Sequence, residues 1–184
     1  MDQRRSEGFA CLLGFGMSIP LSNWMIGHVG VVCPDSGPCL LPVGPGLLAP
    51  SGVLVVGVAF VLRDLVQRRL GKGWTLGAIL LGAVLSALLA PPALVVASAG
   101  AFTLSELADF AVYTPLQRRG LVLAVLASSV VGLVVDSVLF LQLAFGGLAF
   151  LPGQVVGKLW MVVLSLPFIS WLRRRDERLG IQPA

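Results

Sequence analysis

Two carboxylates stand inside an apolar stretch, Thr103–Arg119, and are the first residues of this chain whose type and spacing suggest chemistry. On a helix Glu106, Asp109 and Tyr113 occupy positions i, i+3 and i+7 and therefore share one face. Placing a carboxylate within a membrane helix costs about 2.5–3.5 kcal/mol, so such residues usually face the interior of a bundle or a wet cavity. They could neutralise arginines of a neighbouring helix, or they could bind a ligand or a coupling ion. The second role is the preferred interpretation.

Further polar side chains interrupt other apolar segments. Gln154 and Lys158 are four residues apart and share a helix face. Judged by depth along each helix, Asp136 is level with Lys158, and Arg63 is level with the two carboxylates of the first stretch. Both sets can therefore form ion pairs, that of Arg63 being structural. The expected substrate-binding side chains are Asn23, Glu106, Asp109, Tyr113, Asp136, Gln154 and Lys158. A cavity lined in this way would suit a small polar solute with a flat ring.

The composition places these residues in an integral membrane protein. Of the 184 residues 57% are hydrophobic and only 12% are charged, whereas soluble domains have about a quarter charged. The mean hydropathy is +0.93. Six apolar segments are long enough to be spans, which predicts an all-α bundle of six transmembrane helices forming a single domain over residues 1–184. The expected spans are residues 9–30, 51–67, 74–90, 93–113, 121–145 and 154–172.

The basic residues predict the orientation of this bundle. The net charge of +4 comes from clusters between the apolar segments rather than from one basic surface, so no nucleic-acid partner is expected. Arginine and lysine are concentrated at the N-terminus, at Arg63–Lys72, at Arg118–Arg119 and at Arg173–Arg178. All four clusters fall on one side, and the three opposite loops have none. The positive-inside rule then predicts a multi-pass protein of the cytoplasmic (inner) membrane, with both termini in the cytoplasm.

One of the opposite loops, Val31–Pro50, is dense in proline and glycine, which cannot continue a helix. Its leucines make it too apolar for a free linker, so we expect it to pack over the mouth of the bundle. Cys33 and Cys39 could form a disulfide if that side is oxidising. A metal site from these cysteines with His28 and Asp35 fits no common zinc spacing, and neither a metal nor another cofactor is expected.

Sequence motifs of catalysis are missing. The chain has no HExxH, no GxSxG and no nucleotide-binding Walker sequence, and its single histidine has no evident catalytic partners. We therefore expect a protein that is not an enzyme. Any energy that it uses would have to come from an ion gradient or from another subunit.

Three segments resemble a known family. SELADFAVYTPLQRR, VVDSVLFLQLAFG and GQVVGKLW are similar to segments of the vitamin uptake transporters with six spans, and most closely to the queuosine-precursor branch. APSGVL and LRDLVQRR also fit, so the resemblance covers most of the chain. It implies import of the 7-deazaguanines preQ0 and preQ1, which supply a tRNA modification.

The chemistry of such a ring agrees with the expected site. Glu106 or Asp109 could accept hydrogen bonds from its N1–H and exocyclic amine, while Lys158 or Gln154 could donate to the ring carbonyl. Two alternatives are a substrate-binding membrane component that needs a separate energising subunit, and a non-transporting assembly protein. The oligomeric state is not predicted by these patterns.

The topology is testable with fusion reporters. A reporter that works only in the cytoplasm, fused after the C-terminal residue, should be active, because the arginine clusters hold both termini on that side. The same reporter inserted in the loop Val31–Pro50 should be inactive. Activity of the C-terminal fusion only outside the cytoplasm would contradict the predicted orientation.

Overall fold

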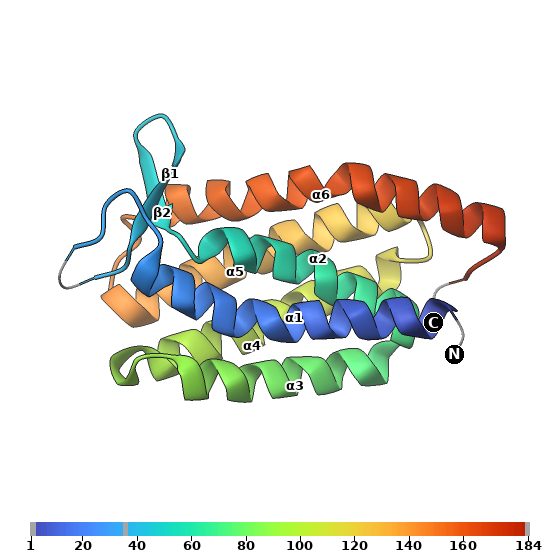
Figure 1. Cartoon of the computed structure of the whole chain (residues 1–184), viewed down its shortest axis with the longest axis horizontal. Coiled ribbons are helices and arrows are strands. Elements are labelled where there is room, and N and C mark those ends of the chain that lie inside the picture. Colours follow the sequence, from blue (N-terminus) through green and yellow to red (C-terminus); the bar gives the residue numbers. More distant parts are fainter. Residues whose placement is uncertain (1–2, 35–36, 183–184) are drawn as a thin grey trace.

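The computed structural model describes residues 3–34 and 37–182, which form six helices and one β-hairpin. The helices run side by side, and the hairpin lies at the end of the bundle opposite both termini (Figure 1). A short 3₁₀ turn, Pro92–Leu94, joins α3 to α4. The elements are α1 (Gln3–His28), β1 (Leu40–Gly44), β2 (Leu47–Pro50), α2 (Val53–Leu70), α3 (Lys72–Leu89), α4 (Val95–Leu116), α5 (Leu121–Phe145) and α6 (Leu151–Leu179).

The all-α class and the six helical segments are confirmed. The bounds differ mainly at the end that carries both termini, where α1 begins six residues before the expected span and α6 continues seven residues beyond it. These extensions contain the basic clusters, which form helix rather than loop. Helix α3 ends before Pro91-Pro92, as the missing backbone donors of proline require.

Helix α2 is the central element of the bundle. It contacts each of the other five helices, and 12 of its 18 residues are buried. The other five helices are each long and apolar enough to cross a membrane. Each of those five contains a stretch of 18 residues with at most two charged side chains, whereas the 18 residues of α2 include four, Arg63, Asp64, Arg68 and Arg69, all of them buried. That α2 crosses the membrane as a sixth span stays a prediction.

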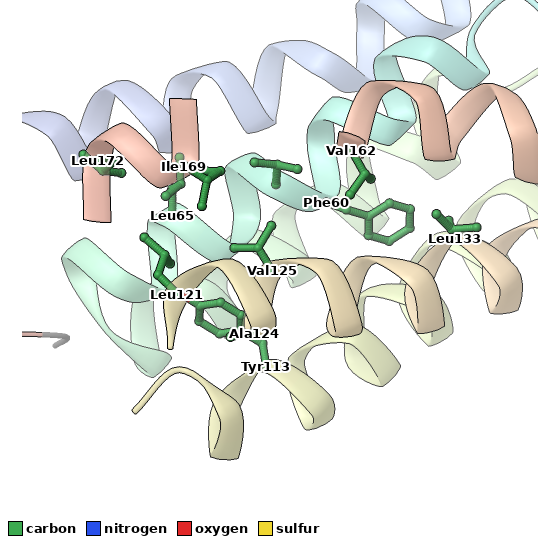
Figure 2. Packing of buried hydrophobic residues seen from close by; sticks show 11 residues of the cluster. Phe60, Leu65, Tyr113, Leu121, Ala124, Val125, Leu133, Val162, Ile169 and Leu172 are labelled. Carbon is green, nitrogen blue, oxygen red and sulfur yellow. The ribbon is translucent and has the colours of Figure 1, made fainter. Parts of the chain in front are cut away.

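The outward faces of the surrounding helices are apolar. Leu13, Leu80, Leu88, Val96 and Leu164 each expose more than half of their surface. Inside, the main apolar cluster joins α2, α4, α5 and α6 and includes Phe60, Leu65 and Val162 (Figure 2). Apolar side chains outside and charged ones in the middle are the arrangement that a bilayer requires, because lipid solvates leucine and not arginine.

The segment expected to be a loop, Val31–Pro50, instead contains the antiparallel hairpin. Its strands pair Leu40 with Pro50 and Leu41 with Ala49. The hairpin docks on α6, where the indole of Trp160 donates to the carbonyl of Val43 at 2.9 Å. Gly153 makes this contact possible, since a Cβ there would overlap the carbonyl oxygen of Leu48. The expected packing against the bundle is therefore confirmed. The prediction of a loop over the whole segment was wrong, because residues 40–44 and 47–50 pair as strands.

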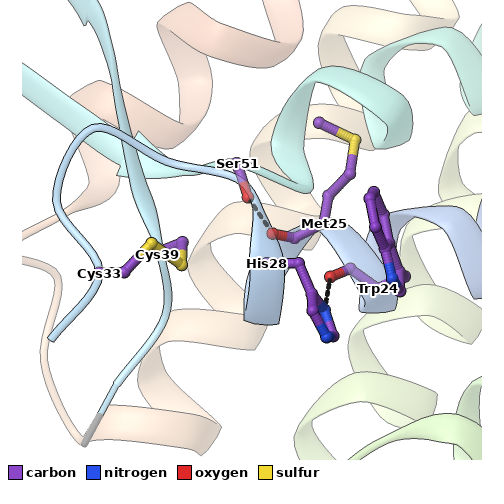
Figure 3. The surroundings of a disulfide bond; sticks show 6 residues. All are labelled: Trp24, Met25, His28, Cys33, Cys39 and Ser51. Atoms are coloured by element: carbon purple, nitrogen blue, oxygen red, sulfur yellow. Dashed lines mark hydrogen bonds between the residues drawn. A yellow bond between two sulfur atoms is a disulfide. The ribbon is translucent and has the colours of Figure 1, made fainter. Parts of the chain in front are cut away.

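A disulfide joins Cys33 to Cys39 beside the end of α1 (Figure 3). The Cys39 amide donates to the Ile26 carbonyl at 2.8 Å, which ties the disulfide loop to α1. His28 contacts the carbonyl of Trp24 at 2.8 Å, within its own helix. Asp35 lies outside the described residues, and within the described part of the chain no cluster of metal-ligating side chains occurs.

Charged side chains also clamp the opposite end of the bundle. Asp176 of α6 accepts hydrogen bonds from Arg68 and Arg69 of α2 at 2.8–2.9 Å. Glu7 of α1 pairs with Arg69, at 3.0 Å, and with Arg175. Asp176 and Arg69 are almost completely buried, with 1% and 2% of their surfaces exposed. Three helices are thus joined through two carboxylates and three arginines.

Replacing Asp176 should weaken this clamp. Asp176→Asn leaves buried Arg68 without its countercharge and leaves Arg69 with Glu7 alone, so we expect the free energy of unfolding in detergent to fall by about 3 kcal/mol. Glu177→Gln is the matched control, because that carboxylate pairs with Arg173 on the exposed side of the same turn. The control should cost less than about 1 kcal/mol. Equal losses in the two variants would contradict the assignment.

Candidate functional site

A cavity of about 510 Å³ lies between the helices on the hairpin side of the bundle. All six helices contribute to its wall, together with Pro38 and Pro50 of the hairpin segment. Its apolar surface includes four phenylalanines, Phe60, Phe102, Phe140 and Phe145. The volume falls within the usual range for small-molecule sites, about 300–1,000 Å³.

One wall of the cavity carries a buried ion pair. The Lys158 ammonium lies 2.6 Å from a carboxylate oxygen of Asp136, and it also donates to Ser137 at 2.8 Å and to Gln154 at 3.0 Å. Lys158 is 2% exposed, whereas the Asp136 side chain is 15% exposed. The expected Asp136–Lys158 pair is therefore confirmed. Its three acceptors satisfy the three donors of the ammonium group, which fixes the Lys158 side chain in place.

Close helix packing brings Lys158 to this position. A Cβ on Gly57 of α2 would lie 2.5 Å from the carbonyl oxygen of Lys158 and 3.0 Å from its Cα. Glycine lets the two backbones approach in this way, as small residues commonly do between membrane helices. The backbone of α6 is thus pressed against the central helix, and its charged side chain stays within the bundle.

A second group of charges lies around Arg63 of α2. Its Nε donates to Glu106 at 3.3 Å, its Nη1 to Gln67 at 3.2 Å, and its Nη2 to Asp109. Nη2 is also 3.0 Å from a carboxylate oxygen of Asp64. The expected pairing of Arg63 with the two carboxylates of α4 is confirmed. Arg63, Asp64 and Asp109 are all completely buried.

Asp64 is a member of this cluster that the sequence pattern did not indicate. It accepts a hydrogen bond from Ser128 of α5 at 2.9 Å, so the cluster links three helices. Its position next to Arg63 in the sequence made it look like part of a basic end of the helix. The composition of α5 could have indicated a buried polar partner for this helix. Its small polar residues Ser128 and Ser129 stand in an apolar helix and are buried.

The structure separates the seven expected binding residues into two groups. Five of them line the cavity: Asn23, Glu106, Asp136, Gln154 and Lys158. Asp109 and Tyr113 share the face of Glu106 as expected but lie beyond the lining residues, fully buried. The Tyr113 ring lies 5.7 Å from the guanidinium carbon of Arg63. These two residues therefore contact the charge cluster rather than the cavity.

Serines make up the part of the wall that sequence reasoning missed. Ser86 and Ser98 share a hydrogen bond of 2.9 Å between α3 and α4. Ser105 lies 3.5 Å from Asp136, at the limit of a hydrogen bond. The lining serines are Ser18, Ser22, Ser86, Ser98 and Ser105. Each one is unremarkable in a single membrane helix, and their grouping becomes visible only when the helices are assembled.

The ion pair on the cavity wall should respond to single and paired substitutions differently. Asp136→Asn leaves the buried ammonium of Lys158 without a countercharge, and we expect the free energy of unfolding to fall by about 2 kcal/mol or more. Lys158→Met should cost less, because Asp136 is partly exposed to the cavity. The double variant should be more stable than Asp136→Asn alone. Additive losses in the double variant would contradict a direct pair.

Part of the chain is similar to a family of transporters. Residues 83–172, just under half of the chain, match the model of a family described as "putative vitamin uptake transporter". No curated protein and no solved structure matches the chain. The matched segment runs from α3 to α6 and contains Glu106, Asp136, Gln154 and Lys158. The segment that supplies most of the polar cavity wall is thus similar to a vitamin uptake transporter family.

Proposed function

We propose that the protein imports a 7-deazaguanine precursor of queuosine, such as preQ0 or preQ1, across the cytoplasmic membrane. The observation that carries this proposal is the cavity, in which the carboxylate of Glu106 and the donors Lys158 and Gln154 line a space walled by phenylalanines. The family match of residues 83–172 supports transport of a small vitamin-like molecule rather than an enzymatic role. The purine-like substrate rests on the chemistry of the cavity and on the sequence resemblance.

The polar groups suit the edge of such a ring. Its N1–H and exocyclic amine are two donors side by side, which a carboxylate can accept as a pair. Glu106 can do so, because only one of its oxygens accepts a hydrogen bond from Arg63. The ring carbonyl needs a donor, and the Gln154 amide can supply it, since its oxygen is already occupied by Lys158. The phenylalanines supply flat apolar surface for the faces of the ring.

The two other expected binding residues on the cavity wall, Asp136 and Asn23, fit a secondary role. Asp136 holds Lys158 and is partly exposed to the cavity, so it can meet a positively charged substituent such as an aminomethyl group. Asn23 donates to the carbonyl of Ile19 at 2.9 Å, which leaves its amide oxygen as an acceptor. Asp109 and Tyr113 act on the substrate indirectly, by fixing Arg63 and through it Glu106.

A host that makes no queuosine precursor and lacks its own transporter provides the functional test. Expression of this protein with preQ0 or preQ1 in the medium should restore queuosine in tRNA, and purified protein alone in liposomes should take up the labelled compound. Rescue in cells without uptake in liposomes would indicate a component that needs an energising subunit. No rescue by either compound, with the protein present in the membrane, would contradict the proposed substrate.

Glu106→Gln tests the site itself. The amide places a donor where the ring also presents donors, and a buried mismatch of this kind costs about 1–3 kcal/mol. We therefore expect Glu106→Gln to reduce uptake at least about tenfold, and Asp136→Asn to do the same. Glu177→Gln, on the exposed end of α6, is the control and should transport normally. Normal uptake by Glu106→Gln would remove this residue from the binding site.

A further inference from the structure

The cluster around Arg63 holds more negative than positive charge. Three carboxylates, those of Asp64, Glu106 and Asp109, surround a single guanidinium group. All four side chains are 97% or more buried. An uncompensated charge in such a place is expensive, and a buried carboxyl group usually takes up a proton instead.

Among the residues that the structure describes, the neighbouring elements bring no further countercharge to the cluster. Helix α5 contributes Ser128, a neutral donor, to the cluster, while its Asp136 lies outside the cluster and is already neutralised by Lys158 of α6. The next basic residue of α2, Arg68, is held by Asp176. Helix α4 adds Tyr113, whose hydroxyl is buried and has no hydrogen-bond partner among the described residues.

Two of the carboxylates are arranged as a pair. Asp64 and Asp109 both contact the same nitrogen of Arg63, Nη2, so their carboxyl groups lie next to each other. The second oxygen of Asp109 is buried and accepts no hydrogen bond from any described residue. Two adjacent carboxylates in a buried site cannot both be ionised at low cost, and such pairs hold one proton between them.

Glu106 connects this pair to the cavity. It is the one member of the cluster that lines the cavity, and it also binds Nε of Arg63. A proton delivered by a hydronium ion in the cavity leaves water behind and forms an O–H bond at a carboxylate oxygen of Glu106, which removes one of the negative charges that Arg63 meets. A ligand that occupies Glu106 changes the charge that Arg63 meets, and so changes the affinity of the aspartates for the proton.

We propose that Asp64 and Asp109 hold an exchangeable proton and that its movement is coupled to transport through Glu106. This coupling rests on the proposed function, whereas the bound proton does not. A proton suits the site better than a metal ion, because the guanidinium group occupies the space between the carboxylates. In addition, the described residues contain no cluster of three or more ligating side chains arranged for a metal.

Infrared spectroscopy of the purified protein, with no substrate present, tests the proton. The wild type at neutral pH should show the carbonyl band of a protonated carboxyl group, and ¹³C-labelled aspartate should shift that band. Asp109→Asn and Asp64→Asn should each abolish it, whereas Asp136→Asn, outside the cluster, should retain it. If a variant fails to fold, the isotope shift in the wild type still decides. A missing band, or one that labelling of aspartate leaves in place, would overturn the proposal.

Uptake into liposomes tests the coupling. With one proton per substrate, a gradient of one pH unit is equivalent to about a tenfold gradient of substrate. An imposed inward proton gradient should therefore accelerate deazaguanine uptake by the wild type, and the ratio of rates with and without the gradient should fall to about one in Asp109→Asn. Acceleration by a sodium gradient and not by protons would overturn the coupling. If the wild type takes up no deazaguanine at all, the proposed function fails, and the infrared band still decides whether the proton is bound.

Discussion

The ion pairs of Arg63 are the interaction on which the rest of this structure depends. Its guanidinium group is completely buried in the middle of the bundle and meets carboxylates of α4 and of its own helix, while Ser128 extends the network to α5. A charge in that position is tolerated only when its partners are in place, because lipid offers no alternative solvation. The central helix therefore cannot leave its position without exposing a charge to the membrane. The same constraint holds Glu106 at the inner limit of the cavity.

Charges also set how α2 and α6 lie along each other. Near one end Arg68 and Arg69 of α2 form ion pairs with Asp176 of α6. In the middle Gly57 of α2 lies directly against the backbone of Lys158 of α6. Because these two contacts are separated along the helix axes, together they fix both the axial position and the rotation of α6 relative to α2. The side chain of Lys158 is then held within the bundle opposite Asp136 of α5. The polar cavity wall is thus a consequence of the packing of α2 with α6, and the hairpin on the first turns of α6 extends that packing to the far end.

Much of the charge pairing could be predicted from the sequence, because the pairing is a physical necessity in lipid. Few charges occur in the apolar segments, and each must find an opposite charge at similar depth, which leaves few choices for Arg63 and for Asp136. The cavity contacts were harder to predict. Glu106 and Tyr113 share a face, yet seven residues advance a helix by about 10 Å, so a cavity that reaches the first need not reach the second.

The burial of Asp64 and the strands of the hairpin could not be predicted from local sequence patterns. Adjacent residues on a helix point in different directions, so Asp64 would normally face away from the partners of Arg63. Both are buried because α2 is surrounded on every side, a property of the assembled bundle. Likewise, the proline and glycine of residues 31–50 exclude a helix but do not specify strands. The paired strands pack on α6, which is distant in sequence, and there Gly153 leaves room for the backbone of Leu48.

Glu106 belongs both to the cavity wall and to the charge cluster, and this double membership has a thermodynamic consequence. A ligand can shift a conformational equilibrium only as far as it binds one state better than another. Because Arg63 and a ligand bound to Glu106 would share the same carboxylate, occupation of the cavity and the charge state of the buried aspartates cannot be independent. The linkage is reciprocal, so whatever neutralises the cluster must also alter the affinity of the cavity for its ligand. A carboxylate that served only to neutralise Arg63 would not need to line the cavity, and one that served only to bind substrate would not need to contact Arg63.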